Sequence, residues 1–369
     1  MTRIAGTLLG YRQNIEAALP LIDSLLFIAA LIATAAAIAP LSRAAPRWGL
    51  VDEAAGRRMH EGSIPLVGGI AMLTVFLCAY LAIGASQSQP LYVALALGIT
   101  LVGGILDDRH EIGSGPKFAF QIAAAAALAL SDSALLTHLG YLMSDNLFTL
   151  GRWSTPLTVF GIIGVMNALN MSDGMDGLAG SLALAATLCF GLVAIVSGNT
   201  EIFSAVCILT GVLAGFLAYN SRSPWRAHAA VFMGDTGSLF LGLVLAWMAI
   251  IMSMDPRTAM APICAVWILA LPIADTVTIM TRRVLRGKSP FKGDREHLHH
   301  IMLALGLSSG QTVAILFAVS LLLGLGGLAA EWLGVPQYVM FYAYVIGVVL
   351  YGLLAESACN RLGLRAQGT

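Results

Sequence analysis

Long apolar runs recur along almost the whole of this 369-residue chain. A bilayer core requires roughly 20 mainly apolar residues per helix. Hydrophobic residues make up 58% of the chain and charged residues only 11%, which excludes an ordinary soluble domain. We therefore predict an all-α, polytopic membrane helical bundle, with residues 1–369 as one integral membrane domain and about eleven transmembrane helices. The apolar runs lie near residues 21–40, 66–84, 91–106, 118–134, 157–170, 178–197, 202–219, 237–253, 259–281, 311–330 and 337–355.

The basic residues predict the orientation of this bundle. One set of alternate loops holds 16 of the 20 Lys and Arg residues, and the opposite set holds only four. Because Lys and Arg accumulate in cytoplasmic loops, we expect the N-terminus outside and the C-terminus in the cytoplasm. The first apolar run is longer than the core of a signal peptide, so we expect a retained span. The five Cys residues lack metal-ligand or disulfide spacing, and the neutral formal charge gives no sign of a nucleic-acid partner.

Five aspartates lie at the ends of apolar runs that this orientation places at the cytoplasmic face. Carboxylates gathered at a bilayer surface repel one another by about 4 kcal/mol per close pair at an effective dielectric near 20. Such a group requires a cation or protons, so the pattern predicts an active site. The five are Asp107, Asp108, Asp173, Asp176 and Asp235.

The pair Asp107 and Asp108 closes the third run, and Lys117 opens the fourth. Two neighbouring carboxylates beside a membrane suit a hard divalent cation, a general base, or one of each. The alternative is a solvated helix end, although acids at a helix C-terminus oppose its dipole. Neighbours on a helix point about 100° apart, so we expect different roles, with Asp107 toward a phosphate acceptor and Asp108 toward the metal.

Polar side chains recur every three residues from Asn167 through Asn170 and Asp173 to Asp176. If this segment is helical, they form one slowly rotating stripe that faces the bundle interior. Polar residues at membrane depth are costly and usually functional. Interhelical hydrogen bonding by the two Asn residues is the alternative.

The segment from Phe232 to Ser238 opens the eighth run and contains Gly234 and Gly237 on either side of Asp235 and Thr236. Backbone N–H groups around two glycines can approach phosphate oxygens, and a helix N-terminus favours anions. We expect Asp235 to hold a metal that bridges those oxygens. The alternative is that Asp235 is a plain N-cap.

Two polar interruptions are long enough to grip a soluble substrate, near residues 41–65 and 282–310. In the first, Arg57 and Arg58 are candidates for binding phosphate, and a positive-inside anchor is the alternative. The second contains a basic stretch, then Arg295 and the three residues His297, His299 and His300. Their spacing does not form a tetrahedral zinc set, so hydrogen bonding to a sugar nucleotide is preferred. Asp275, inside the ninth run, is equally compatible with helix packing and catalysis.

Together these motifs resemble the polyprenyl-phosphate N-acetylhexosamine-1-phosphate transferase family, most closely its WecA type. The resemblance runs in order from Val51 to about His300. It implies transfer of N-acetylglucosamine 1-phosphate from UDP-N-acetylglucosamine to undecaprenyl phosphate, with release of UMP, which initiates cell-surface polysaccharide synthesis. It also implies a requirement for Mg²⁺, with Mn²⁺ as an alternative, and a place in the bacterial inner membrane with the active site on the cytoplasmic face. The oligomeric state stays open, with a homodimer as one option.

The resemblance also implies roles for individual residues. It makes Asp107, Asp108, Asp173 and Asp176 catalytic. It places the metal on Asp235, with Asp108 as a second ligand. It implies that Phe232 contacts uracil and that Asn170, His297, His299 and His300 bind substrate. We expect five further residues to bind substrate with them: Arg57, Arg58, His60, Lys117 and Arg295.

Two alternatives remain at this stage. Another UDP-sugar is the first, such as an N-acetylated deoxyhexosamine or the UDP-muramyl-pentapeptide of the MraY type. That type usually has three consecutive His residues, whereas Leu298 interrupts the run here. The second alternative is a secondary transporter, in which intramembrane acids carry ions. Transporters place such acids near the midplane, often with inverted repeats, and neither feature is visible in this sequence.

Overall fold

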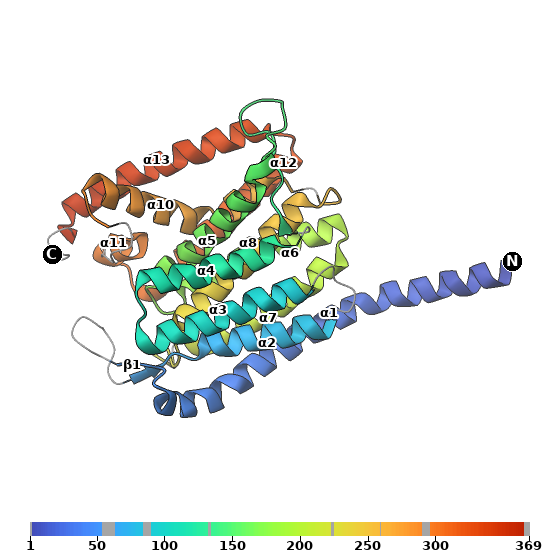
Figure 1. Cartoon of the computed structure of the whole chain (residues 1–369), viewed down its shortest axis with the longest axis horizontal. Helices are drawn as coiled ribbons and strands as arrows, with labels where there is room; N and C mark the ends of the chain where they lie inside the picture. The colour runs from blue at the N-terminus through green and yellow to red at the C-terminus, as the bar shows by residue number, and fades with distance from the viewer. Residues whose placement is uncertain are drawn as a thin grey trace.

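The computed structural model is a bundle of long helices with a small β-hairpin at one end (Figure 1). It describes residues 2–53, 63–83, 90–131, 134–222, 225–258, 260–289 and 296–364, with side chains from residue 21 onward. The elements are α1 (Thr2–Trp48), β1 (Val51–Glu53), β2 (Ser63–Pro65), α2 (Gly68–Ile83), α3 (Pro90–His110), α4 (Ser114–Ala129), the 3₁₀ turn η2 (Gly151–Trp153), α5 (Ser154–Ser172), α6 (Leu178–Ser197), α7 (Thr200–Asn220), α8 (Gly234–Met254), α9 (Pro262–Ile268), α10 (Ala270–Leu285), α11 (Leu298–Ala304), α12 (Ser309–Trp332) and α13 (Gln337–Arg361).

Every predicted apolar run falls on a helix, but fewer helices are long enough to span a membrane than the eleven expected. Within the described residues, eight helices are long and apolar enough, and nine if the bent pair α9 and α10 counts as one span. The helices on the second and fourth predicted runs, α2 and α4, have only 16 residues each. The chain is thus an all-helical, polytopic membrane protein with eight or nine candidate spans. Eleven spans and the predicted orientation remain predictions.

The ninth predicted run is not one straight helix. Its two halves, α9 and α10, meet at an angle of 80°. Pro272 lies in the first turn of α10, where a residue without an N–H group is tolerated, whereas inside a continuous helix it would break the backbone ladder. After the bend, α10 packs against α5, α12 and α13 (Figure 1).

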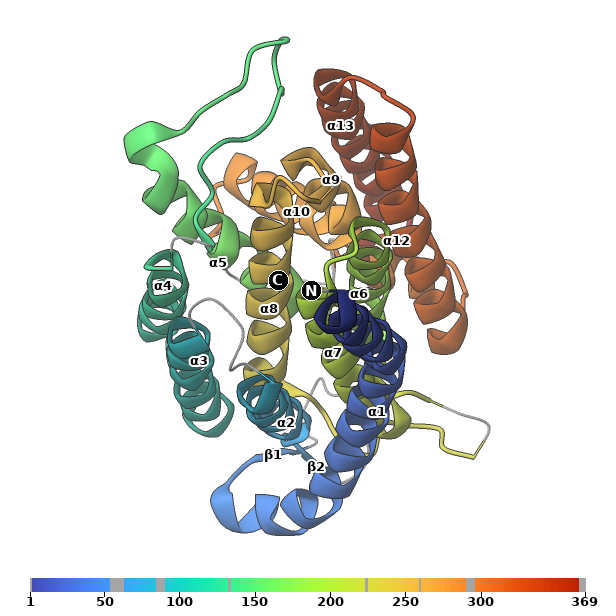
Figure 2. The ribbon, with the colours of Figure 1, turned by 90° about the vertical axis from the view of Figure 1, so that its right-hand side faces the viewer.

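Helix α8 forms the centre of the bundle (Figure 2). In its most apolar stretch 89% of the residues are buried, against only 11% for α13 at the periphery. Aromatic rings fill the space between α2 and α8. Phe76 packs edge to face on Phe240 with ring centroids 5.6 Å apart, and Tyr80 packs on Trp247 with ring centroids 5.5 Å apart. The helices α2, α3, α5 and α6 all pack on α8. Their ends therefore lie around the start of α8.

The two ends of the bundle differ. The hairpin of β1 and β2, helix α11 and the last turn of α13 lie together at one end, and α1 extends beyond the other end (Figure 1). The hairpin pairs antiparallel, with Val51 opposite Pro65. Backbone bonds continue this pairing, because Phe232 N–H donates to the Pro65 carbonyl at 2.9 Å and Gly68 N–H donates to the Phe232 carbonyl at 3.0 Å. The segment before α8 is therefore held against the start of α2.

Candidate active site

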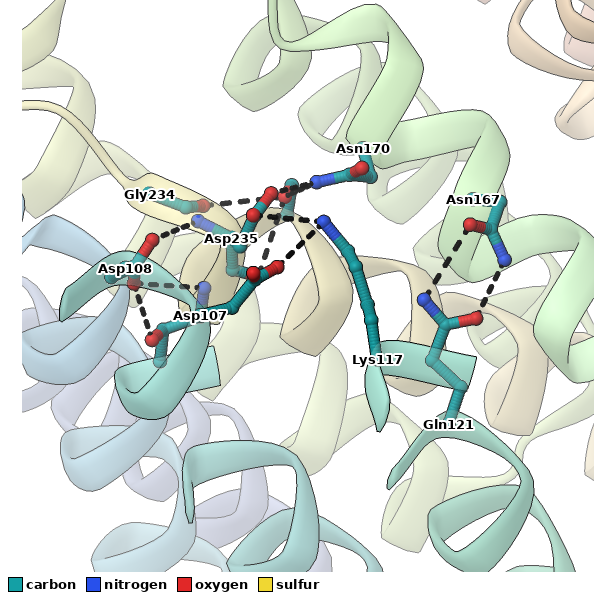
Figure 3. A network of polar contacts seen from close by, with 10 residues as sticks. Asp107, Asp108, Lys117, Gln121, Asn167, Asn170, Gly234 and Asp235 are labelled. Atoms are coloured by element: carbon teal, nitrogen blue, oxygen red, sulfur yellow. Dashed lines mark hydrogen bonds and ion pairs between the residues drawn. The ribbon is translucent and has the colours of Figure 1, made fainter. Parts of the chain in front are cut away.

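The site is built on the first turn of α8, which is capped by a residue from another helix. Asp108, in the last turn of α3, accepts hydrogen bonds at one oxygen from Asp235 N–H at 2.6 Å, and at the other from Thr236 N–H at 3.1 Å and the Thr236 hydroxyl at 2.6 Å (Figure 3). The first N–H groups of a helix have no partner within it, and a carboxylate there is favoured by the helix dipole. Asp108 therefore joins the end of α3 to the start of α8.

This junction corrects two expectations. The N–H groups of Asp235 and Thr236, which were expected to approach a phosphate, are already bound to Asp108. Asp235 is also not the N-cap of α8: that position belongs to Met233, so the Asp235 side chain is left for other contacts. The sequence did not predict this contact because the partners are 127 and 128 residues apart.

Glycine is required where α3, α8 and the preceding loop converge. Gly234 has a φ of +67°, which side chains disfavour. A Cβ there would also lie 2.6 Å from both oxygens of Asp108. In α3, a Cβ on Gly104 would lie 2.4 Å from the Cα of Thr236. These two glycines allow the close approach that brings the acids of α3 and α8 together.

Lys117, in the first turn of α4, lies between two carboxylates. Its Nζ is 2.8 Å from Asp107 Oδ2 and 2.8 Å from Asp235 Oδ2. Asp107 is only 6% exposed, whereas the side chain of Asp235 is 32% exposed. One ammonium group thus neutralises only part of the negative charge of a buried and an accessible carboxylate. We call Asp107, Lys117, Asp235 and Asn170 the acid cluster (Figure 3).

Asn170, near the end of α5, completes the acid cluster. Its Nδ2 donates to Asp235 Oδ1 and to the Ser238 hydroxyl, the latter at 2.9 Å. One turn earlier, Asn167 pairs with Gln121 of α4, donating to Gln121 Oε1 at 2.7 Å. Asn170 therefore orients a predicted metal ligand. Asn167 joins α4 and α5, as the alternative of interhelical hydrogen bonding expected.

The predicted stripe of four polar residues is not one helical face. Helix α5 ends at Ser172, and Asp173 has non-helical dihedral angles of −83° and 49°. Asp173 lies near the acid cluster: burial, and then the charges of Asp235, Asp108 and Asp176, raise its pKa to about 8. The charges of the three neighbouring carboxylates thus add to the effect of burial on this pKa.

Asp176 turns away to a different contact. Its Oδ2 accepts from Arg222 Nε at 2.8 Å and from Ala229 N–H at 3.2 Å. Nearby, the side chain of Asn220 accepts from Gly177 N–H at 2.7 Å and donates to the Val231 carbonyl at 2.9 Å. Both residues fix the loop that leads to Phe232. Asn220 was missed in the sequence, where its place at the end of an apolar run was the only available signal.

The donor set of the acid cluster fits a hard divalent cation. Within the described part of the chain, no three His, Cys, Asp or Glu side chains are grouped closely enough to enclose a metal. Mg²⁺ requires no such cage, because it is usually bound by one or two carboxylates together with substrate phosphates and water. Asp107 and Asp235 supply two carboxylate oxygens around the point that a Lys117 cation already occupies. Both oxygens of Asp108 accept hydrogen bonds from the start of α8, so its predicted role as a second metal ligand would use only the lone pairs that these bonds leave free.

The three predicted His residues lie at the same end, at the start of α11. His297 and His299 are buried, at 7% and 3% exposed. His297 Nδ1 is 2.8 Å from Asp275 Oδ2 of α10. The His299 ring stacks on that of His297 with ring centroids 5.6 Å apart, and the His300 ring lies tilted by 45° against it at 4.2 Å. Burial, followed by the charges of His300 and His297, lowers the pKa of His299 to about 3. We call residues Glu296–His300 the histidine loop.

Gly174 joins the histidine loop to the acid cluster. A Cβ at this position would lie 2.6 Å from His299 Nε2, and the preceding residue is Asp173. The glycine therefore lets a buried imidazole reach the turn that carries a predicted catalytic acid. Four predicted substrate-binding residues, Arg57, Arg58, His60 and Arg295, lie outside the described residues.

The chain matches a known family model and known proteins from several bacteria. Residues 90–253, which run from α3 to the end of α8, match the model of Glycosyl transferase family 4. Over 322 residues the chain is 33% identical to the undecaprenyl-phosphate alpha-N-acetylglucosaminyl 1-phosphate transferase of Escherichia coli K12, covering 86% of each chain. The enzymes of that name from Yersinia pestis and Haemophilus influenzae are 31% identical over 320 residues and 33% identical over 303 residues. In those two cases the match covers 86% and 82% of this chain, and 87% and 85% of the relative.

The matched segment contains every residue of the acid cluster, and the relatives extend over most of the remaining chain. The chain therefore belongs to Glycosyl transferase family 4 and, within it, to the polyprenyl-phosphate N-acetylhexosamine-1-phosphate transferases.

Proposed function

We propose that this protein transfers N-acetylglucosamine 1-phosphate from UDP-N-acetylglucosamine to undecaprenyl phosphate at the cytoplasmic face of a bacterial inner membrane. The observation that carries the proposal is the acid cluster, where Asp107 and Asp235 share one Lys117 at an end of a membrane bundle. The names of the relatives support the substrates. The products are undecaprenyl-pyrophosphate-N-acetylglucosamine and UMP.

The reaction exchanges one pyrophosphate bond for another. An oxygen of the lipid phosphate bonds to the phosphorus that carries the sugar, while the bond from that phosphorus to the bridging oxygen breaks and the oxygen leaves with UMP. The equilibrium therefore lies near unity and no further energy source is required. Catalysis then rests on positioning and on neutralising charge. A lipid acceptor accounts for a site at the bilayer edge.

The contacts support separate tasks for the residues of the site. Lys117 pairs with two carboxylates, and its 20% exposed side chain leaves it within reach of a phosphate oxygen. Asp107, buried beside it, is placed to orient the lipid phosphate or to accept its proton. Asn170 fixes the Asp235 carboxylate in one orientation. Asp108 keeps the start of α8 in register with α3.

Mg²⁺, or Mn²⁺ in its place, would be held by Asp235, with Asp107 nearby, and would neutralise the phosphate oxygens during transfer. Lys117 Nζ contacts the same carboxylate oxygens. When the cation binds, Lys117 must share these oxygens with the cation or move toward a phosphate.

A panel of UDP-sugars tests the assignment. Purified protein is incubated with undecaprenyl phosphate, Mg²⁺ and UDP-N-acetylglucosamine, an N-acetylated UDP-deoxyhexosamine or UDP-muramyl-pentapeptide, and UMP and the lipid product are measured. The proposal expects both products in equal amounts with UDP-N-acetylglucosamine and little from the others. A preference for another sugar would retain the chemistry and change the donor. Absence of UMP with every donor would reject the function.

A further inference from the structure

Asp275 of α10 is a buried carboxylate, 7% exposed, that binds three donors from two other elements. Its Oδ2 faces His297 Nδ1 at 2.8 Å. Its Oδ1 accepts from Leu298 N–H at 3.1 Å and from the Tyr351 hydroxyl of α13 at 2.5 Å. Among the described residues His297 is the only basic side chain in contact with Asp275. The carboxylate thus ties the start of the histidine loop to α10 and α13.

This arrangement selects one form of the His297 ring. A carboxylate only accepts hydrogen bonds, so its partner Nδ1 must carry the proton. In the neutral imidazole the other nitrogen, Nε2, is then an acceptor. A carboxylate that fixes ring tautomer and orientation in this way is the usual support of a functional histidine.

The effect reaches beyond His297. Its ring stacks on that of His299 with an interplanar angle of 20°. The Nε2 of His299 is buried without a hydrogen-bond partner in the described part of the chain, and it is directed at Gly174. A polar atom buried without a partner costs about 1–3 kcal/mol, a cost that a hydrogen bond from a bound substrate would remove.

We propose that Asp275 is a positioning residue for use of the UDP-sugar: it holds His297 in the Nδ1–H form and, through the ring stack, holds His299 against the Gly174 turn. This inference rests on the proposed function, because the histidine loop is taken as part of the donor site. It assigns Asp275 to the site, although the residue lies inside an apolar helix and contacts neither the acid cluster nor its predicted metal.

Asp275→Asn separates this role from helix packing. Leu298 N–H can only donate, so the amide oxygen of Asn must remain on it, and the amide nitrogen must face His297. An N–H donor opposite Nδ1 moves the ring proton to Nε2. The side chain keeps its size, so α10, α11 and α13 should stay packed while the tautomer changes. Tyr351→Phe is the matched control, since it removes one donor to the same carboxylate and leaves the bond to His297.

The experiment measures kcat and KM for the UDP-sugar and for the lipid, with thermal unfolding, in Asp275→Asn, Tyr351→Phe, His297→Ala and the double variant of Asp275 and His297. Asp275→Asn is expected to lower kcat/KM for the UDP-sugar about tenfold to a hundredfold, with the KM for the lipid unchanged. Tyr351→Phe should cost much less. The double variant should match His297→Ala alone, because Asp275 acts through that ring. Wild-type kcat/KM in Asp275→Asn, or additive losses in the double variant, would overturn the proposal.

A second measurement requires no variant of Asp275 and no activity. Nitrogen-15 spectra of the full protein labelled at histidine, with His297 identified from its absence in His297→Ala, report which ring nitrogen carries the proton. We expect Nδ1–H, and Nε2–H would overturn the inference even if Asp275→Asn does not fold. If the wild-type protein releases no UMP from any donor, the proposed function fails, and the spectrum still decides the state of His297.

Discussion

The acid cluster and the histidine loop use the same device in different electrostatic settings. In each, a buried or half-buried carboxylate of one helix accepts hydrogen bonds from backbone N–H groups at the start of another helix. Asp108 of α3 binds two such groups of α8, and Asp275 of α10 binds one of α11. Such capping satisfies donors that no helix can satisfy alone. Both contacts connect segments far apart in sequence at one end of the bundle.

The regions differ in how their charge is balanced. The acid cluster has two carboxylates on a single Lys117, with Asp108 and Asp173 close by. Beside the histidine loop, the carboxylate of Asp275 is surrounded by an imidazole, a hydroxyl and a backbone N–H, and the carboxylate of Glu296 pairs with Arg282 and Arg286. An excess of negative charge favours binding of a cation. A carboxylate whose hydrogen bonds are satisfied instead holds its partner side chains in one orientation. The comparison teaches that the first region is suited to binding a cation and the second to holding a histidine ring in one orientation.

The largest effect is expected at Asp235. Asp235→Asn removes the charge of the accessible carboxylate of the acid cluster and should lower UMP release by about 10²–10³ or more, while the protein stays folded. Asp255→Asn is a matched control, because it lies directly after the last residue of the same helix, α8, and pairs with Arg257. Near-normal turnover of Asp235→Asn at ordinary Mg²⁺ would remove it as the metal ligand.

Lys117→Met should act on the same cluster with a smaller loss, about tenfold to a hundredfold in kcat. The ammonium competes with a cation for oxygens of Asp107 and Asp235. Its removal should therefore lower the Mg²⁺ concentration required for half-maximal rate, even as the rate falls. Lys117→Arg keeps the charge and serves as the control. A Mg²⁺ titration that is unchanged in Lys117→Met would contradict a shared site.

Gly174→Ala tests the contact between the two regions. The new methyl group would lie 2.6 Å from His299 Nε2, so the histidine loop must move. We expect a rise of roughly several-fold in KM for the UDP-sugar with a small change in KM for the lipid, since a displaced contact weakens binding of one substrate. Gly164→Ala in α5 is the control, because its Cβ would meet nothing within 4 Å. Equal effects of the two changes would show that the contact is not used.

The smallest effect is on stability at low pH. Burial holds the pKa of His299 at about 3, against 6.5 for a free ring. Below about pH 6.5, His299 binds a proton in the unfolded chain but not in the folded chain. The free energy of unfolding therefore falls as the pH falls through this window and is unaffected above it. Thermal unfolding midpoints should fall between about pH 7.5 and about pH 5. His299→Gln should show a shallower fall, and an equal fall would place the titrating group elsewhere.

Much of this arrangement follows from the sequence, because hydrophobic runs and their polar ends are local signals. The runs near 91–106 and 237–253 correspond to α3 and α8, and the acids at their ends meet as expected. The partners of those acids could not be predicted. Asp108 and Asp235 differ in role through contacts across more than a hundred residues, and the end of α5 at Ser172 separates Asp173 from the helical stripe. Asp275 was ambiguous because helical position alone does not reveal a partner on another element.

The most direct test of phosphoryl transfer at the acid cluster is the identity of the nucleotide released. Purified protein is given UDP-N-acetylglucosamine with Mg²⁺, with and without undecaprenyl phosphate, and UMP and UDP are separated and measured. Attack on the phosphorus that carries the sugar predicts UMP, formed only with lipid, in equal amount to the lipid pyrophosphate, and lost when Mg²⁺ is chelated. Release of UDP would mean that the sugar alone is transferred, which would contradict the assignment of Asp107, Lys117 and Asp235 to phosphoryl transfer.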